Sequence, residues 1–344
     1  NRGSRIAYFD TSPVMHPLDE LAYVVVPHAP GAKLVPNGLP VFKLAFANDD
    51  DGERKLGTDS RVNFTPPAGG SYLVRVTESK GFGGDRYAYR LIVREAKPDF
   101  TPTLTGANQT IPRGSGRNFS VKLDRVDGFA GAVRVDITGM PKGWIASTPL
   151  VVEAGHLEAM GSIFASADAE TSSETWKQVK LTATATVDGQ AVTKPLNNFG
   201  MLKLGDAPKV FLSLQNSASP LPAAAVGAIP TSIPEITIAP GTEVPAWLRV
   251  VRNGETNLVD LDIENLPHGI IVSDIGLNGV QIDAGATERK IFLHCARWVP
   301  ETDRLCHVIN RSARQSAGDG KPTSSPLLVK VRKSVAEATA SNLK

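Results

Sequence analysis

The chain has 344 residues, which suits about three domains of ordinary size better than one. Its formal net charge is +2 and its basic residues are scattered among acids, which excludes the basic surface that nucleic-acid binding requires. No apolar run approaches the roughly 20 residues that cross a bilayer. Because the chain begins at Asn1 without a signal-peptide pattern, we expect a processed or excised piece whose targeting signal lies upstream.

Strand signals come first along the chain. Residues 71–76 and 87–93 alternate, which would place Tyr72, Val74 and Val76 on one face of a strand. The short linker at Pro98 favours a stiff connection to the next domain. We find no long stretch with helical periodicity, and the tail 334–344 is expected to be a short helix or disordered.

An internal repeat fills the next part of the chain. The segment Ile137–Gly143 matches Ile263–Gly269, and both contain a Pro-x-Gly corner. Further pairs keep nearly the same spacing: Gly114 with Gly241, Arg125 with Arg252, Gly155 with Gly285, and Phe164 with Phe292. We therefore expect two copies of one fold, called repeat 1 (residues 98–207) and repeat 2 (residues 208–333).

Short strands and frequent turns predict the fold class. The segment 179–187 alternates and ends at the hairpin signal Asp188-Gly189, and the strand around Leu261 carries acids on its outer face. This spacing is typical of immunoglobulin-type sandwiches. The prediction is an all-β chain of three consecutive β-sandwich domains: a jelly-roll-like domain over 1–97, and Ig-like domains over 98–207 and 208–333.

Five motifs in the first domain form a recognisable pattern. They are Phe46-Ala-Asn-Asp-Asp-Asp-Gly52, Thr58–Phe64, Gly70–Val76, Gly81–Gly84 and Tyr89–Val93. This order resembles the bacterial pre-peptidase C-terminal domain, a small β-sandwich found beside secreted proteases and in extracellular proteins. The first strands of that family would have to come from residues 1–47. Repeats 1 and 2 resemble the Ig-like repeats that follow this domain in large secreted proteins of planctomycete-type bacteria.

An acidic turn is the candidate metal site. Asp49, Asp50 and Asp51, with Asp59 beyond the loop, gather carboxylates that repel one another without a cation. Calcium takes several oxygen ligands at once, so these residues predict a structural calcium site. The spacing is not that of an EF-hand. The alternative is a solvated acidic turn, because Asp and Gly are ordinary turn residues.

The two cysteines, Cys295 and Cys306, are predicted to form a disulfide. We expect them on two strands of one hairpin, where they would face each other. A zinc site with His294 and His307 is disfavoured, since adjacent residues on a strand point to opposite faces. Free thiols are the remaining alternative.

Catalytic motifs are absent from the sequence. There is no Gly-x-Ser-x-Gly elbow, no His-x-x-x-His pair and no phosphate-binding Gly loop before a helix. His268 has Lys142 as its repeat counterpart, which indicates a surface corner, whereas Trp144 has Ile270, which indicates a packed position. The Pro- and Ala-rich stretch 219–230 is an inserted loop for partner docking or packing, or simply a loop.

These observations favour a non-catalytic, extracellular or cell-surface array of structural or adhesive modules in a bacterial envelope or secreted protein. The expected partners are other envelope or matrix proteins or polysaccharide, with self-association, no nucleic acid and no transmembrane segment. The alternative is an accessory region of a secreted hydrolase whose catalytic domain lies outside this chain. A calcium-dependent binder of carbohydrate or protein is a third reading.

Overall fold

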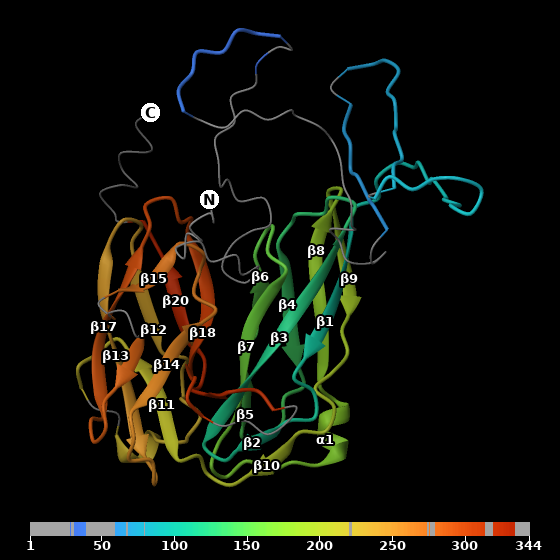
Figure 1. Cartoon of the computed structure of the whole chain (residues 1–344). Coiled ribbons are helices and arrows are strands. Elements are labelled where there is room, and N and C mark those ends of the chain that lie inside the picture. Colours follow the sequence, from blue (N-terminus) through green and yellow to red (C-terminus); the bar gives the residue numbers. More distant parts are fainter. Residues whose placement is uncertain are drawn as a thin grey trace. The chain divides into compact units, whose positions relative to one another are not determined.

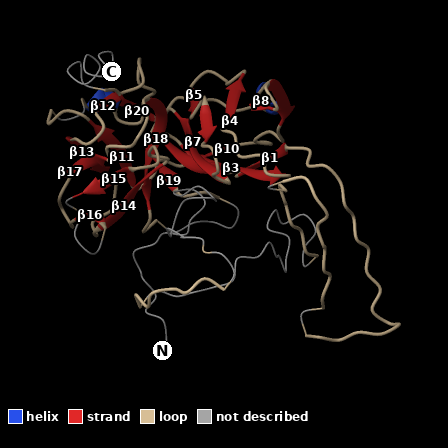
Figure 2. Ribbon diagram, turned by 90° about the horizontal axis from the view of Figure 1, so that it is seen from above, coloured by secondary structure: helices blue, strands red, loops and turns tan. Residues whose placement is uncertain are grey.

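The computed structural model describes residues 28, 31–38, 59–66, 68–78, 80–219, 222–273, 275, 279–313 and 319–333 (Figure 1). The described residues form two compact units, one within Thr101–Leu123 and Ala130–Lys344, the other within Asp19–Phe100 and Asp124–Phe129. Strands dominate, beside the five-residue helix α1 (Ser173–Lys177) and the 3-10 turn Ala223–Ala225 (Figure 2). The all-β prediction is therefore confirmed. None of the helices among these residues is long and apolar enough to span a membrane.

Repeat 1 is built from two antiparallel sheets. One has the order β1-β3-β7-β5 and the other the order β6-β4-β8-β9, while β2 pairs in parallel with β10. The strands are β1 (Asp99–Thr105), β2 (Thr110–Pro112), β3 (Ser115–Val126), β4 (Val133–Thr138), β5 (Trp144–Ala146), β6 (Leu150–Val152), β7 (Glu158–Ala165), β8 (Lys180–Val187), β9 (Gln190–Pro195) and β10 (Lys203–Gly205).

Repeat 2 has the same plan. The order β11-β13-β17-β15 matches β1-β3-β7-β5 of repeat 1, and β12 pairs in parallel with β20 as β2 does with β10. The opposite sheet holds β16, β14, β18, β20 and β12. The strands are β11 (Val210–Gln215), β12 (Glu235–Ile238), β13 (Glu243–Arg252), β14 (Val259–Glu264), β15 (Ile270–Ser273), β16 (Val280–Ile282), β17 (Glu288–Cys295), β18 (Thr302–Asn310), β19 (Pro322–Thr323) and β20 (Leu327–Val331).

The core follows the alternation read from the sequence. Strands β14 and β8 bury every second residue, as their apolar period predicts. Trp144 is 5% exposed and its repeat counterpart Ile270 is 1% exposed, so the packed position predicted for Trp144 is correct. The Trp144 ring meets Trp176 of helix α1 edge to face, with 4.9 Å between the ring centroids.

The described residues between 59 and 97 form no strand. The strands predicted over 71–76 and 87–93 are therefore wrong for this structure, and apolar side chains such as Tyr72 and Val74 are exposed. Alternation alone is insufficient, because an extended segment becomes a strand by pairing with a neighbour. The predicted sandwich over 1–97 is not tested, since much of that range and the tail 334–344 lie outside the described residues.

Asp127 organises the smaller compact unit. Its backbone has a positive φ of 53°, and its buried carboxylate contacts the guanidinium groups of Arg61 and Arg94. The backbone N–H of Lys97 also donates to Asp127 Oδ2 at 2.8 Å. One carboxylate thus contacts residues near both ends of the range 61–97.

Candidate functional site

The predicted calcium site falls mostly outside the described residues. Asp49, Asp50 and Asp51 are not described, whereas Asp59 is described and exposed. Within the part of the chain that the structure describes, no group of three or more His, Cys, Asp or Glu side chains could hold a metal ion. The calcium site therefore stays a prediction.

Calcium binding has a direct thermal test. We expect added calcium to raise the unfolding midpoint of the chain, and a chelator to lower it, because a ligand of the native state stabilises it. At a calcium concentration of 100 Kd the gain in unfolding free energy is about 2.7 kcal/mol. Asp50→Asn should remove most of the shift. Identical midpoints with calcium and chelator would leave the turn as a solvated loop.

The predicted disulfide is wrong, because Cys295 and Cys306 are both free and buried. The hairpin assumption failed. Cys295 ends β17, which lies between β13 and β15, whereas Cys306 lies on β18, which pairs with β14 and β20 in the other sheet. The connection between the two strands thus crosses from one sheet to the other. Among the described residues, these two cysteines and the flanking His294 and His307 do not form a group that could hold a metal ion.

The buried thiols should be unreactive. Burial raises the pKa of Cys295, and raises that of Cys306 from its ordinary value of 9.0 to about 12. The folded chain should therefore resist a thiol reagent at pH 8, and the chain unfolded in denaturant should react fully. Because the folded pKa is raised, native stability holds below pH 9.0 and falls as pH rises from there toward about 12. Rapid labelling of the native chain would contradict this.

The most distinctive constellation joins the two repeats. Strand β19 pairs with β18 of repeat 2 at Ile309 and with β3 of repeat 1 at Gly116 and Arg117. This pairing merges strands of both repeats into one ten-stranded sheet. Nothing in the sequence predicted it, since a two-residue strand gives no periodic signal. We call the contacts between the repeats the junction.

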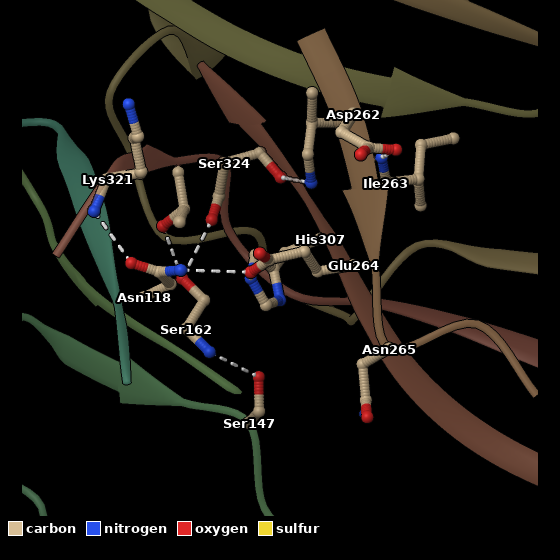
Figure 3. Close-up of polar contacts among 12 residues, drawn as sticks. Asn118, Ser147, Ser162, Asp262, Ile263, Glu264, Asn265, His307, Lys321 and Ser324 are labelled. Atoms are coloured by element: carbon tan, nitrogen blue, oxygen red, sulfur yellow. Dashed lines mark hydrogen bonds and ion pairs between the residues drawn. The ribbon is translucent and has the colours of Figure 1, made fainter. Parts of the chain in front are cut away.

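Buried hydroxyl groups hold β19 in place (Figure 3). Ser162 Oγ lies 2.6 Å from Thr323 Oγ1 and also donates to the carbonyl of Ser324 at 3.0 Å. Ser115 Oγ donates to the carbonyl of Thr323 at 3.1 Å. Because these groups are buried, their mutual hydrogen bonds compensate the loss of water.

Asn118 connects this network to an acid and a histidine. Its Oδ1 accepts from the N–H of Lys321 at 2.7 Å, and its Nδ2 donates to Glu264 Oε2 at 3.1 Å (Figure 3). The same Glu264 oxygen lies 3.1 Å from Nε2 of His307, which is fully buried. The side chain of Asn118, from repeat 1, thus bridges two elements of repeat 2.

A buried ion pair forms a second contact between the repeats. Arg304 of β18 lies 3.1 Å from Glu153 and donates to the carbonyl of Val151 at 2.7 Å. The Arg304 side chain is 6% exposed, and that of Glu153 is 23% exposed. Burial lowers the pKa of Arg304, and the neighbouring Glu153 carboxylate opposes that shift. The contact links β18 of repeat 2 to Glu153 of repeat 1.

His268 also lies at the junction. Its backbone N–H is 3.4 Å from Glu153 Oε1, and its ring centroid is 5.3 Å from that of His156 and 4.9 Å from that of Trp298. The sequence-based interpretation of His268 as a surface corner is therefore wrong. The prediction was based on Lys142, the counterpart of His268 in repeat 1. It failed because the two repeats have different neighbours at this corner.

The Pro- and Ala-rich loop provides a third contact. The carbonyl of Gly227 accepts from the N–H of Ala167 at 3.0 Å. A Cβ added at Gly114 would lie 3.0 Å from the Cα of Gly227, so the two backbones approach closely. Of the roles considered for this loop, packing is the one that the structure shows at Gly227.

The polar groups of the junction bond mainly to one another. Arg304 pairs with Glu153, Glu264 accepts from the amide of Asn118, and the hydroxyl groups bond to backbone carbonyls or to one another. Sequence reasoning missed Arg304, Glu153 and Asn118. The sequence held little signal for them, because the strand 302–310 mixes polar and apolar residues. It is the fold that buries Arg304 and His307, and buried ionisable residues need partners.

No protein-family model and no curated protein matches the chain. Solved structures with a similar arrangement include the D00-D0 domain of Intimin, at 10% identity and a TM-score of 0.21, covering 67% of this chain and 99% of that one. Domains 4 and 5 of the S-layer protein SbsC have 11% identity and a TM-score of 0.20, covering 57% and 76%. Fibronectin(III)-like modules of Clostridium thermocellum CbhA have 13% identity and a TM-score of 0.18, covering 68% and 94%.

Proposed function

We propose that the chain is a non-catalytic structural module of an extracellular or cell-surface protein, in which two Ig-like repeats act as one stiff spacer. The observation that carries this is the insertion of β19 between β18 and β3. A linker alone would leave two sandwiches free to reorient, whereas a shared sheet fixes their relation through hydrogen bonds. The ion pair of Arg304 with Glu153 adds a second fixed point.

The finer assignment rests on the sequence motifs. The pattern Phe46–Gly52 to Tyr89–Val93 supports a pre-peptidase C-terminal domain over 1–97, in a secreted protein of planctomycete-type bacteria. Two free cysteines give no support for an oxidising compartment, so the proposed extracellular location depends on that resemblance. The proposed partners are envelope or matrix proteins, polysaccharide or a second copy of the chain.

Stiffness at the junction can be measured by pulsed electron paramagnetic resonance. Spin labels at the exposed residues Thr186 of repeat 1 and Thr287 of repeat 2 should give one narrow distance distribution. Labels at Lys122 and Thr186, both within repeat 1, provide the reference width. Cys295 and Cys306 should remain unlabelled because they are buried. A distribution much broader than the reference would refute the stiff spacer.

The non-catalytic proposal has its own test. The purified chain should show no turnover of peptide, ester, glycoside or phosphate-ester substrates at any calcium concentration. Reproducible turnover that survives further purification, and that is lost on substitution of a single residue, would overturn it.

A further inference from the structure

Each repeat ends in a parallel pair between an early strand and its last strand. In repeat 2, Glu235 to Ile238 of β12 lie beside Leu328 to Val331 of β20 in parallel register. In repeat 1, Thr110 to Pro112 of β2 lie beside Lys203 to Gly205 of β10. Neighbouring strands elsewhere in these sandwiches, for example β13 and β17, run antiparallel.

The β12–β20 pair is bonded at both ends. The N–H of Leu328 donates to the carbonyl of Pro234 at 2.8 Å, and the N–H of Arg332 donates to the carbonyl of Ile238 at 3.0 Å. Lys330 Nζ donates to Glu235 Oε2 at 2.7 Å across the pair. Below the bonds lie the buried side chains of Ile236, Ile238, Leu327, Val329 and Val331.

The parallel register of β12 and β20 determines how the pair responds to a pulling force. The chain enters β12 at Glu235 and leaves β20 at Val331, and these residues lie at opposite ends of the pair. Tension applied at these two ends therefore slides β12 along β20 and strains all the hydrogen bonds between them together. In the whole chain, tension reaches β12 through β11, which pairs with β13. If the two strands were pulled apart from the same end, the hydrogen bonds would break one after another, and each bond alone resists only weakly.

We propose that the parallel pair β12–β20 is a force-bearing clamp, so that the chain withstands tension along its length and serves as a tether. Repeat 1 has a weaker clamp. It has three residue pairs against four, its strand β2 ends in Pro112, which has no N–H, and its bond from Arg113 to Gly205 is long at 3.4 Å. Under rising tension, repeat 1 therefore yields before repeat 2.

This inference extends the proposed function, and it can succeed or fail separately. Stiffness depends on contacts between the repeats, whereas the clamp lies within repeat 2. A broad distance distribution across the junction would leave the clamp intact, and a weak clamp would leave the junction stiff.

The decisive experiment pulls the full chain in two directions in an optical trap. DNA handles attach through azide-bearing residues introduced at Ser232 and Lys333, which load β12 and β20 in shear, or at Ala239 and Lys333, which open the same pair from one end. At equal loading rate the shear geometry should need at least about twofold more force, because its hydrogen bonds break together. Equal rupture forces in the two geometries would overturn the clamp.

A variant pair adds a second measurement. Leu328→Pro removes the N–H that bonds Pro234, and should lower the shear force toward the value of the other geometry. Val280→Ala creates a cavity in β16, away from the clamp, and should lower the equilibrium stability while changing the shear force less. A larger loss of shear force for Val280→Ala than for Leu328→Pro would count against the clamp. If Leu328→Pro does not fold, the two geometries in the parent chain still decide.

Discussion

Replacing Glu153 with glutamine is expected to lower the free energy of unfolding by about 2–4 kcal/mol, which is among the largest effects of any single junction substitution. The substitution keeps the size of the side chain and removes its charge. Arg304 is then left in a nearly water-free site with neutral acceptors alone, the Val151 carbonyl and the amide oxygen of the new side chain. The expected loss of unfolding free energy is smaller than for a fully buried ion pair, because the Glu153 side chain is 23% exposed.

The cost arises from the charge left behind, and a double replacement tests this. Glu153→Leu combined with Arg304→Met removes both charges and should recover much of the lost stability, because an apolar pair needs no desolvation of ions. The matched control is the exposed pair of Glu174 and Lys177, 2.6 Å apart, where Glu174→Gln should leave the free energy unchanged. Urea denaturation measures all four chains. If Glu153→Gln costs no more than Glu174→Gln, the pair does not link the repeats.

The sequence predicted what depends on local pattern. The all-β class followed from period-two alternation, and the packed position of Trp144 followed from comparison with Ile270 in the sister repeat. Both signals lie within a few residues of the position they describe, or within a collinear copy of it. Repetition is informative because two copies of one fold must bury equivalent positions.

Predictions failed where they required knowledge of which elements are neighbours. Cys295 and Cys306 are close in sequence, but the connection between their strands crosses from one sheet to the other, so closeness along the chain did not mean pairing. The residues 71–76 have the alternation of a strand and lie exposed without one. Alternation states which face is apolar, and the partner that covers that face comes from elsewhere in the fold.

The sequence did not predict the junction, for a related reason. Its strand β19 has two residues, and its polar side chains come from β3, β7, β14 and β18, which are far apart in sequence. Hydroxyl and amide residues at those positions look like ordinary surface choices. Their role becomes apparent once the fold buries them against each other, because a buried polar group requires a partner.

Adding a methyl group at Gly320 is expected to displace β19 and to lower the free energy of unfolding by about 1–3 kcal/mol. A Cβ there would collide with the backbone carbonyl of Asn118, and would lie 2.5 Å from Asn118 Oδ1 and 2.9 Å from Gln109 Oε1. Gly116→Ala should act in the same way, because its Cβ would collide with Thr323 Oγ1 and lie 2.7 Å from the carbonyl of Ile163. Neither glycine has a positive φ, so lack of space is the cause in both.

Hydrogen exchange of the two variants distinguishes a local effect at the junction from a general loss of stability. Gly83→Ala is the control, since no atom lies within 4 Å of its added Cβ and its φ is not positive. Hydrogen exchange should accelerate at the N–H of Asn118, which bonds the Lys321 carbonyl, and at the N–H of Ser324, which bonds the Val308 carbonyl. Strand β8, which pairs with β4 and β9, should keep its protection. Uniform acceleration across repeat 1 would mean that β19 is an integral part of that sandwich. Unchanged exchange at Asn118 and Ser324 would mean that the strand tolerates the methyl group, and that the shared sheet does not hold the repeats together.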